Sequence, residues 1–327
     1  MTIAARRSPS LADEGRGGSV TEDAPARVLL IAGSGRSGST MLANLLGSAP
    51  GVFSGGEVRY LFERGLRDNR LCGCGVPFRD CPTWRAVLDR AAGSPEALDA
   101  AGLAAAAARW GRIRRFPRLV VASPGRLPAG LGGYAGLVDR LYRAIPAVTG
   151  ASLIVDSSKL PAYGRLIDLL PGVDLRVVHL VRDPRAAAYS WSRHKPLADG
   201  ARPAEMERIA PTKSAALWNV WNAAAGVLWS GDPARYLRLP YESLLAEPRV
   251  WVERILAMAG QPAELDGVFV GDRTVRLQTS HTVAGNPDRL RRGEIVLRLD
   301  DEWRERMSRR DRALVGVMTA PVRSFLR

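Results

Sequence analysis

The chain has 327 residues, 46% of them hydrophobic, which is enough to build the core of one α/β domain. Its formal net charge is +14, and three of its 47 basic residues are lysines, which leaves 44 arginines. Part of this charge reflects the arginine bias of a GC-rich genome, and the rest favours an anionic ligand. We find no 18-residue apolar run that would span a membrane. Nor do we find a helix-turn-helix, zinc-finger or RNA-binding aromatic signature, so a specific nucleic-acid partner is not expected.

Residues 1–26 mix charged and small side chains and lack the apolar centre of a signal peptide. This composition predicts a disordered tail and a cytoplasmic protein whose thiols stay reduced. Residues 27–327 are expected to form a single domain.

Short apolar runs alternate with helical stretches along the rest of the chain. Strands are expected over Arg27–Ala32, Gly51–Phe53, Leu153–Val155, Arg176–Val181 and Arg235–Leu239. Helices are expected over Thr40–Ser48, Pro161–Leu170, Pro184–His194, Thr212–Trp229, Pro248–Ala259 and Asp300–Ala313. This alternation predicts a P-loop NTPase-like, three-layer α/β fold with a central, mainly parallel sheet flanked by helices.

The stretch Gly33-Ser34-Gly35-Arg36-Ser37-Gly38-Ser39-Thr40 follows the first expected strand and opens a helix. Such a loop turns backbone N–H groups towards an anion at the positive end of the helix. Its spacing is that of G-x-x-x-x-G-K-[ST], but Ser39 stands at the lysine position. Arg36 is the nearest cation. The loop therefore suits a phosphate but lacks the lysine that cleaves a metal-bound triphosphate.

Glu57 is the best candidate for a general base, because it lies 21 residues after Arg36, behind one helix and one short strand. Partial burial is expected to raise its pKa. The alternative is an exposed loop glutamate paired with Arg59. Lys159 ends another expected strand, where a compact cation can neutralise a leaving group.

Three cysteines, Cys72, Cys74 and Cys81, fall within ten residues. Zinc binding is one alternative, but a structural zinc site normally needs four ligands, so a local disulfide or a thiol cluster that shapes the loop is favoured and no metal ligand is assigned. The surrounding stretch 68–150 is expected to be largely helical, and either an insert over the acceptor site or plain scaffold. A basic loop over Lys195–Pro211 is a candidate lid.

Arg182 ends the expected strand Arg176–Val181, and Ser190 follows eight residues later in a helix that begins with Pro184. An arginine and a serine in these positions can hold one phosphate from two sides. The alternative for Arg182 is an ion pair with Asp183 or Asp174. Of the histidines, His179 is expected in the core. His281 follows Ser280 in a late loop, where contact with a nucleotide is one possibility.

Several of these segments resemble sulfotransferases that use 3′-phosphoadenylyl sulfate (PAPS), in order from about Arg27 to Trp303. The likeness is greatest to bacterial members and to the tyrosylprotein and carbohydrate type. The matching segments are Arg36–Thr40, Arg182–Ser190, Tyr241-Glu242-Ser243-Leu244 and the late loop from Ser280 to Gly293.

The resemblance implies a role for each matching residue. Arg36, Ser37, Gly38, Ser39, Thr40 and Ser280 would hold the 5′-phosphosulfate, and Arg182, Ser190, Arg291, Arg292 and Gly293 the 3′-phosphate. Glu57 matches the catalytic glutamate and Arg59 an acceptor-site arginine, whereas Gly56 replaces a further family glutamate. Lys159 lies near a family lysine.

The implied reaction is metal-independent transfer of a sulfuryl group from PAPS to a hydroxyl of a small-molecule, glycolipid or sugar acceptor. Two alternatives remain at this point: a nucleotide-dependent kinase, which would require Mg²⁺, and a basic nucleic-acid-binding protein, whose binding would fall steeply with salt.

Overall fold

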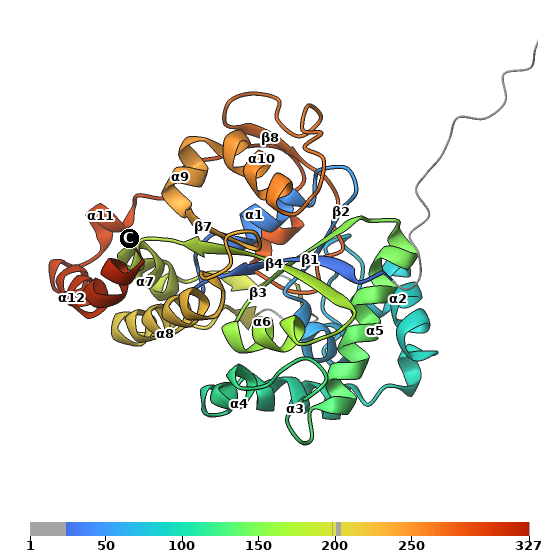
Figure 1. Cartoon of the computed structure of the whole chain (residues 1–327). Helices are drawn as coiled ribbons and strands as arrows, with labels where there is room; N and C mark the ends of the chain where they lie inside the picture. Colours follow the sequence, from blue (N-terminus) through green and yellow to red (C-terminus); the bar gives the residue numbers. More distant parts are fainter. Residues whose placement is uncertain (1–23, 198, 201–203, 327) are drawn as a thin grey trace, which may run out of the picture.

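The computed structural model describes residues 24–197, 199–200 and 204–326, so nearly all of the expected N-terminal tail lies outside the described residues. A five-stranded sheet crosses the middle of the molecule, with the order β2-β3-β1-β4-β7 and every neighbouring pair parallel (Figure 1). The strands are β1 (Ala26–Ala32), β2 (Val52–Gly56), β3 (Leu153–Lys159), β4 (Val173–Val181) and β7 (Tyr236–Pro240). The expected P-loop-type α/β fold is confirmed.

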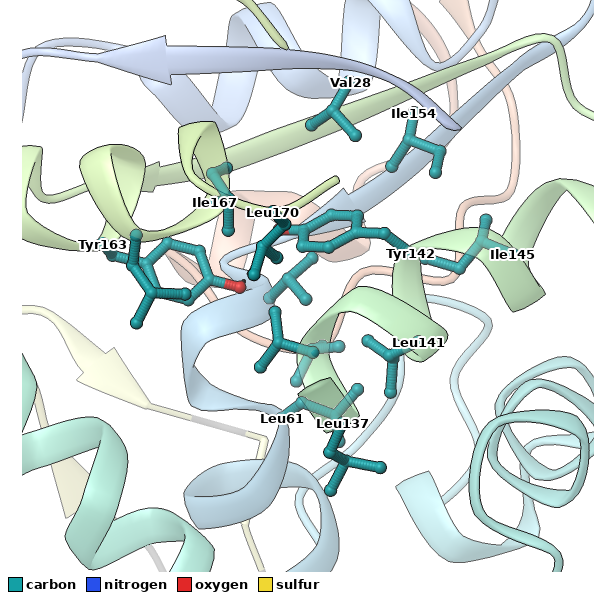
Figure 2. Close-up of a cluster of buried hydrophobic side chains, with 14 of the residues drawn as sticks. Val28, Leu61, Leu137, Leu141, Tyr142, Ile145, Ile154, Tyr163, Ile167 and Leu170 are labelled. Atoms are coloured by element: carbon teal, nitrogen blue, oxygen red, sulfur yellow. Dashed lines mark hydrogen bonds between the residues drawn. The ribbon is translucent and has the colours of Figure 1, made fainter. Parts of the chain in front are cut away.

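Helices cover both faces of this sheet, which explains why its strands are continuous apolar runs. Along β1, Val28 and Leu30 enter the core cluster on one face, while Leu29 and Ile31 enter the cluster on the other. Figure 1 shows α9 (Tyr241–Ala246) and α10 (Pro248–Met258) on one side and α5 (Gly132–Thr149), α6 (Pro161–Asp168) and α8 (Pro211–Trp229) on the other. In Figure 2, Val28 and Ile154 of the sheet lie over side chains of α5 and α6.

The principal helices begin and end close to their expected positions, and prolines open four of them, where the missing N–H has no cost. They are α1 (Ser39–Leu46), α6 (Pro161–Asp168), α7 (Pro184–Ser192), α8 (Pro211–Trp229) and α10 (Pro248–Met258). The short helix α9 (Tyr241–Ala246) was not expected.

One expected helix is wrong. The stretch Asp300–Ala313 divides into α11 (Trp303–Arg306) and α12 (Arg309–Phe325). The division falls at Ser308, whose backbone is extended and whose side chain accepts a hydrogen bond from the N–H of Asp311. An N-cap of this kind starts a new helix.

The segment 68–150 is helical, as expected, with α2 (Pro82–Ala92), α3 (Ala100–Trp110), α4 (Phe116–Val120) and α5 (Gly132–Thr149). Part of it is scaffold, because α5 buries Tyr142 and Ile145 in the core beneath the sheet (Figure 2). Two antiparallel hairpins complete the described chain: β5 (Pro196–Leu197) with β6 (Ala204–Glu205), and β8 (Thr274–Leu277) with β9 (Gly293–Val296). In the part of the chain that is described, no helix has the length and apolarity to cross a bilayer.

Candidate active site

The loop between β1 and α1 is tightly enclosed. A Cβ on Gly33 would lie 2.4 Å from the carbonyl oxygen of Leu180, and one on Gly38 would lie 2.3 Å from Cε2 of Tyr241. Both glycines also have positive φ, 127° and 91°. Glycine is therefore required at both positions by space and by backbone conformation. Gly38 is the N-cap of α1 and supplies no side-chain acceptor, so the first N–H groups of the helix remain available to a ligand.

Polar side-chain atoms of this loop are buried without hydrogen-bond partners. They are the hydroxyl oxygens of Ser34 and Ser37 and the Nε and Nη2 atoms of Arg36. Arg36 has a left-handed backbone (φ 64°), its guanidinium lies 4.6 Å from the ring of Trp191, and Nη1 contacts Sδ of Met206 at 3.2 Å. Unpartnered buried donors are costly. A bound anion at this loop would satisfy them.

Glu57 follows β2 and pairs with Lys159 at the end of β3. Nζ of Lys159 donates to Oε1 of Glu57 at 2.6 Å, and the side chains of Lys159 and Glu57 are 11% and 14% exposed. The same Nζ donates to the carbonyl of Ser157 at 2.8 Å. The alternative of an exposed glutamate paired with Arg59 is therefore wrong, because the carboxylate is largely buried and pairs with Lys159.

The net pKa of Glu57 differs from the expected direction. Burial raises it, but the charge and hydrogen bond of Lys159, with the charges of Arg64 and Arg59, outweigh burial and lower the pKa below its ordinary value. The carboxylate is thus ionised at neutral pH. Burial lowers the pKa of Arg36 below its ordinary value, although the negative charges of Glu57 and Asp288 act to raise it.

A buried polar network supports the strand end that carries Lys159. Asp156 is fully buried and accepts hydrogen bonds from the N–H of Ser158 (2.7 Å) and the hydroxyl of Tyr142 (2.5 Å). The hydroxyls of Tyr142 and Tyr163 lie 3.0 Å apart, among the apolar side chains drawn in Figure 2. Lys159 itself has φ 63°. Non-glycine residues in this region need such support and are concentrated at functional sites.

Arg182 lies beside the phosphate loop and is 7% exposed. Its Nη1 donates to the carbonyl of Arg36 at 3.2 Å, and its guanidinium lies 4.7 Å from the ring of Tyr241. Its acidic contact is a 3.4 Å approach to Asp300. The alternative of a pair with Asp183 or Asp174 is wrong, because these carboxylates bind Arg185 and Arg176. Ser190 lies on α7, partly exposed.

The late loop approaches the site through residues that the sequence did not single out. The carbonyl of Ala284 accepts a hydrogen bond from the N–H of Glu57 at 3.1 Å. Gly285 passes so close that an added Cβ would lie 3.5 Å from Oγ1 of Thr40 and 3.9 Å from Oε1 of Glu57. The N–H of Asn286 donates to Oγ1 of Thr40 at 3.4 Å. The small residues Ala284 and Gly285 were the sequence signal from which a close approach of this loop could have been predicted.

The other late-loop candidates make contacts elsewhere. Arg291 pairs with Asp288 at 3.1 Å, and Arg292 donates to the carbonyl of Gly73 at 3.1 Å. Gly293 begins β9. The carbonyl of Ser280 also packs against Gly73. His281, which the sequence allowed beside the nucleotide, instead directs its ring at the cysteines 72, 74 and 81. His179 is fully buried, as expected, between Tyr236 and Asn222.

A pocket of about 240 Å³ is lined by residues that follow Glu57 and Lys159 in the chain, although neither of these two side chains lines it. Arg59, Tyr60 and Leu160 belong to its lining, and the segment 68–150 contributes Ala107, Ala108, Trp110, Gly111, Arg112 and Tyr134. This segment therefore contributes both to the core and to the wall of a cavity beside the site. A second pocket, of about 280 Å³, lies beyond Arg182 towards α11 and α12.

The expected lid passes over the phosphate loop in its described part. Met206 contacts Arg36, and Nζ of Lys195 pairs with Asp288 at 2.7 Å. Met206 and Trp191 of α7 therefore both contact the guanidinium of Arg36.

The β1–α1 loop lies at the end of the central strand, carries Arg36 and faces the buried Glu57–Lys159 pair, on a P-loop-type α/β fold. A model of the sulfotransferase family matches residues 29–264. The chain belongs to the sulfotransferase family, whose members move a sulfuryl group.

Solved structures resemble the chain at low identity. The sulfotransferase domain of the olefin synthase of Synechococcus has 20% identity and a TM-score of 0.49, over 91% of this chain and 96% of that chain. The sulfotransferase domain of the curacin biosynthetic pathway has 16% identity and a TM-score of 0.48, over 90% and 98%. A sulfotransferase from Mycobacterium avium has 15% identity and a TM-score of 0.41, over 73% and 65%. A search of curated proteins found no match.

Proposed function

We propose that the chain transfers the sulfuryl group of PAPS to a hydroxyl of a small-molecule, glycolipid or sugar acceptor, without a catalytic metal. The observation that carries this proposal is the set of buried, unpartnered polar atoms on Ser34, Arg36 and Ser37, directly beside the Glu57–Lys159 pair. Such donors suit a phosphosulfate anion.

The donor, when bound, supplies an activated sulfuryl group on a phosphate leaving group. The loop residues Ser37, Gly38, Ser39 and Thr40 bind this end through backbone N–H and hydroxyl groups, and Arg36 adds a cation. Arg36 cannot lose its charge at working pH, so it offsets the charge that develops on the leaving oxygen. Ser280 is retained as a candidate in this role.

In the proposed reaction Lys159 acts on the leaving group of the donor, and Glu57 acts on the hydroxyl of the acceptor. In the structure they neutralise each other at 2.6 Å. An anionic donor at the loop offers Lys159 a second partner, and Lys159 then stabilises the leaving group while Glu57 becomes free. Oε1 of Glu57 accepts the proton of the acceptor hydroxyl, so that the new S–O bond forms as the bond to the leaving phosphate breaks.

Arg182 and Ser190, with Arg291, Arg292 and Gly293, are proposed to hold the 3′-phosphate. The only acidic partner of Arg182 among the described residues is Asp300, at 3.4 Å, which leaves the guanidinium able to bind an oxyanion. Its bond to the carbonyl of Arg36 links the two phosphate sites. The 240 Å³ pocket lined by Arg59 is proposed to receive the acceptor. Cytoplasmic action is part of the proposal, and it would keep the three cysteines reduced.

The test is calorimetric titration with 3′-phosphoadenosine 5′-phosphate, ADP and ATP, without magnesium and at moderate salt. We expect the bisphosphate to bind best and Arg182→Ala to weaken it by more than about tenfold, the loss of a charge-assisted contact of about 1.5–3 kcal/mol. Arg85→Ala, which removes an exposed arginine paired with Glu96, is the matched control and should leave binding unchanged. Equal binding of ATP, or an equal effect of both variants, would contradict the assignment.

A further inference from the structure

Four metal-binding side chains meet at one point outside the proposed active site. Cys72, Cys74 and Cys81 come from the loop that precedes α2, and His281 comes from the loop that follows β8. The three Sγ atoms and one ring nitrogen all lie within 4.8 Å of one another. Cys72 and Cys81 are fully buried, and Cys74 and His281 are partly buried.

The separations match a tetrahedral zinc site. With Zn–S bonds of about 2.3 Å and a Zn–N bond of about 2.0–2.1 Å, a regular tetrahedron sets its sulfurs about 3.8 Å apart and each sulfur about 3.6 Å from the nitrogen. Sγ of Cys74 lies 3.8 Å from Sγ of Cys81. Nδ1 of His281 lies 3.3 Å from Sγ of Cys81 and 3.9 Å from Sγ of Cys72. These three separations lie within about 0.3 Å of the tetrahedral values, and the other three do not exceed 4.8 Å.

The imidazole of His281 is fixed with Nδ1 towards the sulfurs. Its Nε2 lies 3.2 Å from Oγ1 of Thr83. This hydroxyl oxygen can accept a hydrogen bond from Nε2–H, which leaves the lone pair on Nδ1. Its ring stacks at 7° on Phe53, and its carbonyl accepts a hydrogen bond from Nε1 of Trp84. Hydrogen bonding to the second nitrogen is the usual way in which proteins orient a histidine ligand of a metal.

We propose that Cys72, Cys74, Cys81 and His281 bind one structural zinc ion. Three thiolates and an imidazole around a closed centre are a ligand set that selects zinc over magnesium or calcium. The alternative of a local disulfide leaves one of the three cysteines unpaired, and the structure holds all three as free thiols. Binding of Zn²⁺ displaces the thiol protons to solvent and involves no change of oxidation state.

The zinc ion would connect the cysteine loop to the backbone that supports Glu57. Beyond His281, the carbonyl of Thr282 accepts from the N–H of Gly73 at 2.9 Å, and the N–H of Val283 donates to the carbonyl of Gly55 at 2.9 Å. The carbonyl of Ala284 accepts from the N–H of Glu57. The metal therefore has no contact with a reacting atom, and its role is to position the loop on which Glu57 rests.

The first test uses the unmodified full chain, purified without a polyhistidine tag from cells grown with zinc. Elemental analysis should find one zinc per chain, and a mercurial thiol reagent should release it to a chromogenic chelator. Replacement by Co²⁺ should give the intense visible absorption of a tetrahedral thiolate site. Substoichiometric zinc together with three thiols that react freely in the native protein would overturn the proposal.

Variants separate zinc binding from simple misfolding. Cys74→Ser, at the partly exposed ligand, should lose zinc, and His281→Ala should do the same. His281→Cys should retain one zinc, because four thiolates also form a tetrahedral site. His194→Ala is the matched control, since His194 is 67% exposed and lies outside the cluster, so it should keep full zinc content. If His281→Ala binds zinc as the wild type does, His281 is not a ligand. These readouts do not depend on PAPS, so they are independent of the proposed function.

Discussion

Replacing Glu57 by glutamine tests the proposed base directly. The change keeps the shape of the side chain and removes its negative charge and its ability to take a proton. Loss of a positioned general base lowers a rate by about 10²–10⁴-fold. At about 1.4 kcal/mol for each factor of ten, this is about 3–5 kcal/mol of barrier.

The structure also sets a stability cost for Glu57→Gln. Nζ of Lys159 would keep the carbonyl of Ser157 at 2.8 Å but lose its ionic partner at 2.6 Å. Because both side chains are largely buried, the lost charged hydrogen bond should cost about 1.5–3 kcal/mol. Urea unfolding measures this cost, which is small enough to leave the chain folded under assay conditions.

The assay is transfer of radiolabelled sulfate from PAPS to a panel of phenols, sugars and glycolipids, with kcat measured on the best acceptor. We expect kcat to fall by the factor above while binding of the bisphosphate product is unchanged. Glu96→Gln, at an exposed glutamate paired with Arg85, is the control and should retain full activity. A folded Glu57→Gln variant that keeps most of the wild-type kcat would refute the role of Glu57.

The pH dependence follows from the lowered pKa of Glu57. A carboxyl with a depressed folded-state pKa contributes its stability above the ordinary value of 4.5, and this contribution disappears as pH falls through the folded value. The stability difference between wild type and Glu57→Gln should therefore be full at neutral pH and vanish only below 4.5. In the same way, kcat/KM should show no acidic limb from Glu57 between neutral pH and that value. A limb near neutrality that Glu57→Gln abolishes would contradict this.

Two further changes test the scaffold of the site. Gly38→Ala should weaken bisphosphate binding and cost about 2–4 kcal/mol in urea unfolding, because it adds a clash with Tyr241 to an unfavourable backbone. Gly93 has a similar φ of 84° and nothing within 4 Å of an added Cβ, so Gly93→Ala should lose only the stability due to the unfavourable backbone. Equal losses of stability in the two variants would show that Tyr241 moves aside without cost. Tyr142→Phe removes the hydroxyl donated to Asp156 and should destabilise the chain by about 1–3 kcal/mol and lower kcat. Unchanged stability would mean that a water replaces the hydroxyl.

Local sequence signals predicted much of the fold. The apolar run before Gly33 fixed the position of β1, and prolines 161, 184 and 248 marked helix starts within the first turn. The division of the stretch Asp300–Ala313 at Ser308 was missed, although a serine three residues before an aspartate is itself an N-cap signal. The β8–β9 hairpin was also missed, since its strands are four residues each and a long loop separates them.

The candidate site was predictable only where its signals are local. Arg36 and Arg182 each follow a strand in a recognisable pattern, and the structure joins them by a hydrogen bond at 3.2 Å. The pKa of Glu57 was expected to rise because burial is readable from position, whereas its 2.6 Å contact with Lys159, 102 residues away, is not. His281 was likewise inaccessible as a companion of Cys81, because 200 residues separate them in the chain. Tertiary pairing, rather than residue type, decides such cases.

The position of β1 at the centre of the sheet determines which parts of the molecule open easily. β1 is hydrogen-bonded along both edges, to β3 and to β4, so its amide protons can exchange with solvent only when the whole sheet opens. Met206, which contacts Arg36, instead directly follows β6, a two-residue strand that pairs only with the two-residue strand β5. So short a pair of strands separates at far lower free energy than the central sheet. A ligand held between the β1–α1 loop and the β5–β6 segment would contact one side that opens only with the sheet and one side that opens at much lower free energy. Its residence time would then be set by the weaker side, and substitutions there would alter the dissociation rate without loosening the phosphate loop.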